Sequence, residues 1–175
     1  MFSRLACFLG VIFPVIASAQ FDVLIKNGTI YDGTGNAWYR ADIGVQNGRI
    51  VRIGQLGQST AGTVIDASGL AVAPGFIDVH GHIESGIINT PTADNYIYDG
   101  VTTVITGNCG SSEENIADFF RRTDSLKTSI NIATLYGHNT VRNAVMQREN
   151  RAPTAAELKQ MEDLVDSAML AGAVG

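Results

Sequence analysis

The stretch Gly75-Phe76-Ile77-Asp78-Val79-His80-Gly81-His82 decides how this chain is interpreted, because an apolar run ends there on two histidines one residue apart. Side chains along an extended strand alternate between its two faces, so His80 and His82 are expected to point the same way. Neutral imidazole nitrogens are common ligands of divalent transition metals. The pair therefore indicates a metal site. The alternative is a strand end with one surface histidine and one buried histidine.

The composition limits the class of protein. The chain has 175 residues, of which 45% are hydrophobic and 17% are charged, and these values are typical of a globular protein with a core of its own. The net charge of −5 argues against a nucleic-acid surface, and the basic pair Arg121-Arg122 is interpreted as a solvated helix face. No segment after the N-terminus is apolar for long enough to span a membrane.

Residues 1–19 have the pattern of a cleavable export signal. Arg4 gives a positive start, residues 5–16 form an apolar stretch, and Ala17-Ser18-Ala19 supplies the small residues that precede a cleavage site. The mature chain is then expected to begin at Gln20 and to be periplasmic or secreted. The alternative is a retained N-terminal anchor.

Residues 20–72 are predicted to be all-β. Short strands flank Asn27-Gly28 and Asn47-Gly48, and both dipeptides are typical of two-residue hairpin turns. Another strand is expected at 63–65, followed by turn residues at 66–69. About fifty residues form only a marginal core, so this segment is expected to pack on a partner segment.

From residue 73 onwards the pattern changes to alternating strands and helices. Strands are expected at 76–79, at the β-branched run 101–106, at 130–136 and from 173 onwards. This alternation predicts an α/β fold with a parallel sheet and crossover helices; a β/α barrel is preferred, and a doubly wound sheet is the alternative. Three helices are expected. The first is 91–99, capped by Thr90 or Thr92 and ended by Gly100. The second begins with a Ser111–Glu114 capping box and continues through Phe120, and the third begins with a Thr154–Glu157 capping box and is ended by Gly172.

Two further candidate residues follow predicted strands, which is where β/α barrels place their active sites. Cys109 has no partner for an internal disulfide once Cys7 leaves with the signal. Its thiolate would be a strong zinc ligand, and the alternative is an inert buried thiol. His138 is predicted either to orient a substrate or to cap the turn by hydrogen bonding to the backbone. No serine has the glycine-flanked turn of a nucleophile elbow.

Several segments resemble the N-acyl-D-amino-acid deacylases (D-aminoacylases) of the amidohydrolase superfamily. The His-x-His segment 74–82 marks the superfamily, and Gly107-Asn108-Cys109-Gly110 narrows the resemblance to the deacylases. Segments 137–142 and 168–175 also fit. The resemblance implies a metal-dependent hydrolase with a (β/α)8 barrel of the TIM type and a small β-sandwich beside it.

The resemblance also implies roles for parts of the chain. It assigns His80, His82 and Cys109 to the binding of one or two Zn²⁺ ions. It makes 20–72 the β-sandwich segment and 73–175 the first three or so strands of the barrel. The substrate would be a small N-acyl-D-amino acid, which is split into a carboxylate and the free D-amino acid. The other ligands and the catalytic aspartate are expected beyond residue 175, because a complete barrel needs about 250 residues.

Two alternatives to deacylation stay open. One is another amidohydrolase reaction, such as hydrolysis of cyclic amides or imides. Those relatives often bridge two metals with a carbamylated lysine, and the lysines of this chain, Lys26, Lys127 and Lys159, do not lie at predicted strand ends. The other alternative is that the chain as given is a catalytically silent fragment that lacks the remaining ligands.

Overall fold

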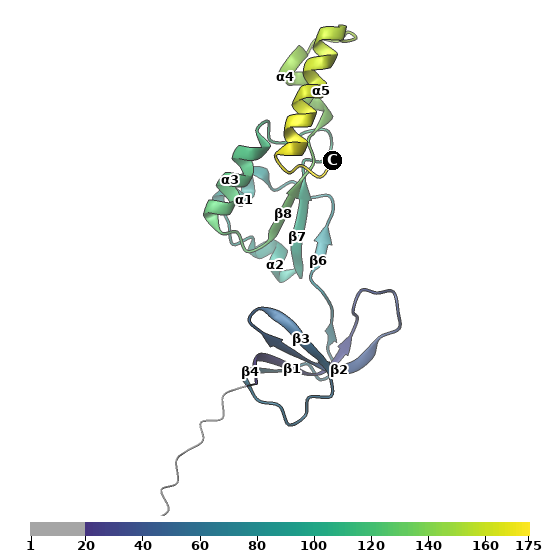
Figure 1. The fold of residues 1–175 in the computed structure, drawn as a ribbon, viewed down its shortest axis with the longest axis vertical. Coiled ribbons are helices and arrows are strands. Elements are labelled where there is room, and N and C mark those ends of the chain that lie inside the picture. Colours follow the sequence, from purple (N-terminus) through teal and green to yellow (C-terminus); the bar gives the residue numbers. More distant parts are fainter. Residues whose placement is uncertain (1–19) are drawn as a thin grey trace, which may run out of the picture. The chain divides into compact units, whose positions relative to one another are not determined.

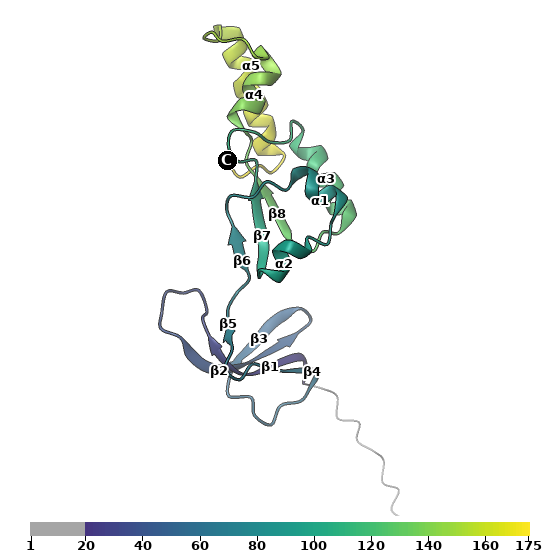
Figure 2. The ribbon, with the colours of Figure 1, turned by 180° about the vertical axis from the view of Figure 1, so that it is seen from behind.

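The computed structural model of the chain describes residues 20–175, which form two compact units at 20–74 and 75–175 (Figures 1 and 2). Each unit has a β-sheet of its own. The predicted export signal at 1–19 lies outside the described residues. Within residues 20–175, no helix combines the length and the apolar character needed to cross a membrane.

The first unit is built on a five-stranded sheet of mixed direction. β1 is central, since it pairs antiparallel with β2 and parallel with both β4 and β5. Phe21, Leu24 and Leu56 form a buried cluster of this unit. The strands are β1 (Phe21–Ile30), β2 (Tyr39–Gln46), β3 (Arg49–Gly54), β4 (Ala61–Asp66) and β5 (Ala71–Val72), in the order β3-β2-β1-β4.

One of the two predicted hairpin turns is confirmed and the other is wrong. Asn47 and Gly48 connect β2 to β3 with φ angles of 52° and 70°, as a two-residue hairpin requires. Asn27, with φ of 62°, instead forms a bulge inside β1, where the register with β2 shifts. The chain cannot reverse there because β1 has a neighbour on each edge, and the Asn27 N–H donates to Asp42 Oδ1 at 2.8 Å.

The second unit contains a parallel sheet in the order β6-β7-β8. The predicted alternation of parallel strands and helices is therefore confirmed. Figures 1 and 2 show α1, α2 and α3 on one side of this sheet, and α4 beside α5 beyond the strand ends. The elements are β6 (Phe76–Asp78), α1 (Glu84–Asn89), α2 (Asp94–Tyr98), β7 (Val101–Thr106), α3 (Ile116–Leu126), β8 (Asn131–Thr134), α4 (His138–Met146) and α5 (Ala155–Leu170).

The residues after α5 return to the end of β8. Gly172, with φ of 109°, follows the helix end, as predicted. The Val174 N–H donates to the Thr134 carbonyl at 2.9 Å, and the Tyr136 N–H donates to the Gly175 carbonyl at 2.8 Å. Residues 173–175 thus bond to the chain at and just after β8 but form no strand in the structure, so the strand expected from residue 173 is not observed.

The predicted capping box at α5 is confirmed. The Thr154 side chain accepts from the Glu157 N–H, and the Glu157 carboxylate accepts from the Thr154 N–H. The box expected at Ser111 and Glu114 is wrong, because α3 begins later, with Asn115 as its cap. Ser112 instead bonds to the start of α4: its N–H donates to Thr140 Oγ1 at 2.9 Å.

Helices α1 and α2 differ from the prediction for the segment between β6 and β7. The expected helix at 91–99 is shorter, since α2 begins at Asp94 after Ala93, which has φ of 47°. Its predicted end is confirmed, because Gly100 follows with φ of 78°. Helix α1 was not expected, because it has only six residues and one of them is a glycine, which disfavours a helix. Burial of Ile87 stabilises it.

Helix α4 was also not expected from the sequence. Its residues are mostly polar, and only one side of the helix is apolar. Val141 and Met146 on that side pack with Met161 of α5. The partner helix, rather than local propensity, therefore stabilises α4.

A prediction concerns Asp42, a buried carboxylate that accepts the Asn27 and Leu56 N–H groups, each at 2.8 Å. Asp42→Ala is expected to lower the free energy of unfolding by about 2 kcal/mol at pH 7, because two backbone donors lose their acceptor. The exposed Gln58→Ala is the control and is expected to leave stability unchanged. Urea denaturation measures both.

The same variant has a pH dependence with a defined sign. The hydrogen bond from the Asn27 N–H holds the pKa of the Asp42 carboxyl below its ordinary value. Burial raises this pKa, and the hydrogen bond from the Leu56 N–H lowers it further. The ionised carboxylate therefore stabilises the fold above its unfolded-state pKa, and this contribution is lost as the pH falls through the lower folded-state pKa. The stability difference between the parent chain and Asp42→Ala should shrink in acid, and a difference that grows in acid would contradict this account.

A second prediction concerns Gly107, directly after β7, which has φ of 80° and lies against the Leu135 carbonyl. Gly107→Ala is expected to destabilise the fold by about 3 kcal/mol. An alanine is strained at this positive φ, and its Cβ would collide with the Leu135 backbone. Gly86→Ala is the matched control: nothing lies near its Cβ position within α1, so the fold should be unchanged or more stable. Thermal unfolding of the two variants compares them, and equal effects would refute the explanation.

Candidate metal centre

The candidate residues lie in two loops at the same edge of the parallel sheet. β6 ends at Asp78, so His80 and His82 both lie in the loop that leads to α1. The expectation that they belong to one extended strand is therefore wrong. Cys109 lies in the loop after β7, the strand that pairs with β6.

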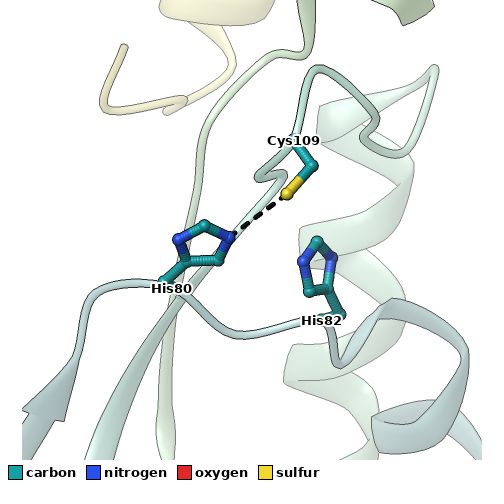
Figure 3. A group of neighbouring side chains, drawn as sticks. All are labelled: His80, His82 and Cys109. Atoms are coloured by element: carbon teal, nitrogen blue, oxygen red, sulfur yellow. Dashed lines mark hydrogen bonds between the residues drawn. The ribbon is translucent and has the colours of Figure 1, made fainter.

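The three side chains converge, and Figure 3 shows them pointing toward one another. One donor atom from each lies within 4.8 Å of the other two, and no further His, Cys, Asp or Glu of residues 20–175 joins this group. His80 Nε2 lies 3.3 Å from Cys109 Sγ, and the rings of His80 and His82 are 5.5 Å apart between centroids. All three residues are exposed, so neither the buried histidine nor the buried thiol considered above is present.

Backbone contacts hold the histidine loop against the end of β7. The Gly81 N–H donates to the Ile105 carbonyl at 3.0 Å, which continues the strand pairing beyond β6. A Cβ at Gly81 would collide with the side chain of Val104, so only glycine allows the loop to approach this closely. The Asp78 carboxylate accepts from the His80 N–H at 3.0 Å and fixes the start of the loop.

The cysteine loop is fixed by its own turn and by the start of α4. Cys109 and Gly110 both have positive φ, 56° and 80°. The Ser111 N–H donates to the Asn108 carbonyl at 3.2 Å and closes the turn, and the Asn139 N–H donates to the Gly110 carbonyl at 2.7 Å. The thiol is therefore carried by a tight turn with hydrogen-bonded backbone on both sides.

Glu84 and Glu113, which line a hollow with His82, have partners outside the donor group. Glu84 Oε1 accepts from the Gly107 N–H at 3.0 Å, and Glu113 pairs with Arg122 at 2.8 Å. Burial raises the pKa of the Tyr96 hydroxyl, and the charges of Asp78 and Glu84 raise it further. His82 and Glu84 line one hollow of about 340 Å³ together with Ser111, Ser112, Glu113 and Glu114.

His138 does not belong to the donor group. It is the first residue of α4 and is exposed, and it lines a separate hollow with Tyr136 and with Leu158 and Glu162 of α5. Its predicted role in orienting a substrate stays a prediction.

In the described part of the chain, the donor group thus consists of two imidazoles and one thiol, a set suited to a divalent transition metal.

Comparisons with known proteins identify the family to which this chain is similar. Residues 63–175 match the amidohydrolase family, and residues 15–75 match the N-terminal domain of the urease alpha-subunit. A D-aminoacylase of Alcaligenes xylosoxydans xylosoxydans is 38% identical over 90% of this chain, which spans 37% of that protein.

Solved structures give the same result for the fold. An N-acyl-D-glutamate deacylase from Bordetella bronchiseptica, complexed with zinc and a phosphonate inhibitor, is 41% identical with a TM-score of 0.82; the match covers 89% of this chain and 37% of that one. A D-aminoacylase described for its binuclear metal centre is 35% identical with a TM-score of 0.82, over 89% of this chain and 38% of that one. The chain thus spans under two fifths of the length of these relatives. With a family match over residues 63–175 and a mixed α/β fold shared with these deacylases, the chain belongs to the amidohydrolase family.

Proposed function

We propose that this chain is part of a zinc-dependent N-acyl-D-amino-acid deacylase, in which His80, His82 and Cys109 bind the metal. The convergence of three donor atoms within 4.8 Å carries this proposal. The relatives named D-aminoacylase and N-acyl-D-glutamate deacylase, the latter complexed with zinc, support it. The number of ions is proposed as one or two, since one relative has a binuclear centre.

The donor set fits zinc in both chemistry and spacing. Zinc takes imidazole nitrogen at about 2.0–2.1 Å and thiolate sulfur at about 2.3 Å, so ligands on one tetrahedral ion lie about 3.5 Å apart. His80 Nε2 and Cys109 Sγ are already 3.3 Å apart, and the third donor requires only a small approach. Their exposure leaves the donor group open to solvent and to a ligand.

A zinc ion held there supplies Lewis-acid polarisation of a carbonyl group and acidifies a bound water. The chain's own residues supply position. The Asp78 carboxylate and the Gly81 N–H fix the histidine loop, and the turn at 108–111 presents the thiol. In the proposed reaction, water adds at the amide carbonyl carbon and the C–N bond breaks. The acyl group leaves as a carboxylate, and the nitrogen takes up a proton as the amine of the D-amino acid.

The finer fold and location are part of the same proposal. We propose that β6, β7 and β8 are the first strands of a (β/α)8 barrel, which the parallel order of these strands supports. Residues 20–72 would be the β-sandwich segment and 73–175 the barrel part. The pattern of residues 1–19 supports export to the periplasm or the medium.

The metal assignment predicts the effect of four variants on zinc binding. His80→Ala, His82→Ala and Cys109→Ala should each weaken zinc binding at least about tenfold, because each removes a ligand. His138→Ala is the matched control, since it removes the remaining histidine of the chain from outside the donor group. Isothermal titration of the metal-free chain measures all four. Equal losses in His138→Ala and Cys109→Ala would exclude this assignment.

The deacylase assignment predicts which protein turns over substrate. The 175-residue chain alone is expected not to hydrolyse N-acetyl-D-methionine, because the resemblance places the catalytic aspartate beyond residue 175. The chain extended by its downstream sequence should release D-methionine, and the L-enantiomer and hydantoin are the control substrates. Turnover by the 175-residue chain would refute the first expectation, and hydrolysis of hydantoin alone would favour a cyclic amide hydrolase.

A further inference from the structure

Asn108 occupies the space between the two loops that carry the donor group. Only 9% of its surface is exposed. Its side-chain nitrogen Nδ2 donates to the Ile105 carbonyl at 2.9 Å and to the Gly81 carbonyl at 3.3 Å. Because both neighbours are acceptors, the amide must present its NH₂ group, and one hydrogen serves β7 while the other serves the histidine loop.

Asn108 and the residues that it contacts adjoin all three donor residues in the chain. Gly81 lies directly between His80 and His82, so its carbonyl fixes the segment that carries both imidazoles. The Ile105 carbonyl accepts from the Gly81 N–H as well as from Asn108, which fixes Gly81 a second time. Cys109 is the residue after Asn108. A single buried amide thus connects the loop of the imidazoles to the turn of the thiol.

We infer that Asn108 is a positioning residue that sets the spacing of the His80, His82 and Cys109 donor atoms. Its effect on zinc rests on the function proposed above, whereas its effect on geometry applies to the metal-free chain. Without the amide, the Gly81 carbonyl loses this donor, and the histidine loop keeps its contacts to Ile105 and Asp78 but loses its direct bond to the segment that carries the thiol. Hydrogen bonds that orient metal ligands typically change metal affinity by about 10- to 100-fold.

Three variants test this inference. Asn108→Leu removes both hydrogen bonds at nearly constant size, and Asn108→Ser keeps a donor for only one of the two carbonyls. Asn131→Leu is the matched control. The Asn131 Nδ2 also donates to a β7 carbonyl, that of Thr102 at 3.1 Å, but at the opposite end of the strand from Cys109.

Three measurements on the 175-residue chain separate geometry from metal binding. In the metal-free protein, an NOE between the rings of His80 and His82, 5.5 Å apart in the structure, is expected in the parent and in Asn131→Leu and should be lost in Asn108→Leu. In zinc titrations, Asn108→Leu should bind at least about tenfold more weakly, with Asn108→Ser intermediate. With Co²⁺, the thiolate-to-cobalt absorption should fall in the same order.

Each outcome distinguishes the two proposals. An Asn108→Leu chain that keeps the NOE and binds zinc as tightly as the parent overturns the positioning role. If the parent binds no zinc but only the Asn108 variants lose the NOE, the positioning role stands and the proposed metal centre fails. If Asn108→Leu does not fold, Asn108→Ser decides by the same measurements, and unchanged values in that variant refute the inference.

Discussion

Parallel pairing of β6 with β7 is the constraint on which the candidate metal centre depends. Asp78 pairs with Val104, so the two strands run in the same direction and end at one edge of the sheet. The Gly81 N–H then extends the pairing by one more bond, to the Ile105 carbonyl. This alignment brings His80 within reach of Cys109, although 29 positions separate them in the chain.

Close backbone contacts convert this alignment into a defined site. The loops at this edge approach one another at Gly81, Gly107 and Gly137, and at each a side chain would collide with its neighbour. Glycine loses more conformational entropy on folding than other residues, and the hydrogen bonds that these approaches allow offset that cost. The result is a buried framework of main chain and Asn108, with the imidazoles and the thiol left exposed above it.

The sequence correctly predicted those elements whose backbone conformation and hydrogen bonds are decided by residues close together in the chain. The β-branched run at 101–106, the Asn47-Gly48 turn and the Thr154–Glu157 capping box are confirmed, because each is decided by residues close together in the chain. The Asn27-Gly28 turn was wrong because two neighbouring strands hold β1 extended through it. Helix α4 was missed because its apolar side is stabilised by α5 rather than by its own composition.

The sequence by itself determined which residues could carry the chemistry. A His-x-His segment and a cysteine after successive strands indicated the donor set, because chemical type and position relative to strands can be seen in the chain. Only the tertiary structure decided that the donors meet. Cys109 follows β7 as predicted, whereas His80 and His82 lie in the loop after β6 and not on one face of a strand. The physical reason is that the histidine loop and the cysteine loop meet through hydrogen bonds between residues distant in sequence, among them the bond from the Gly81 N–H to the Ile105 carbonyl and the bond from Asn108 Nδ2 to the Gly81 carbonyl.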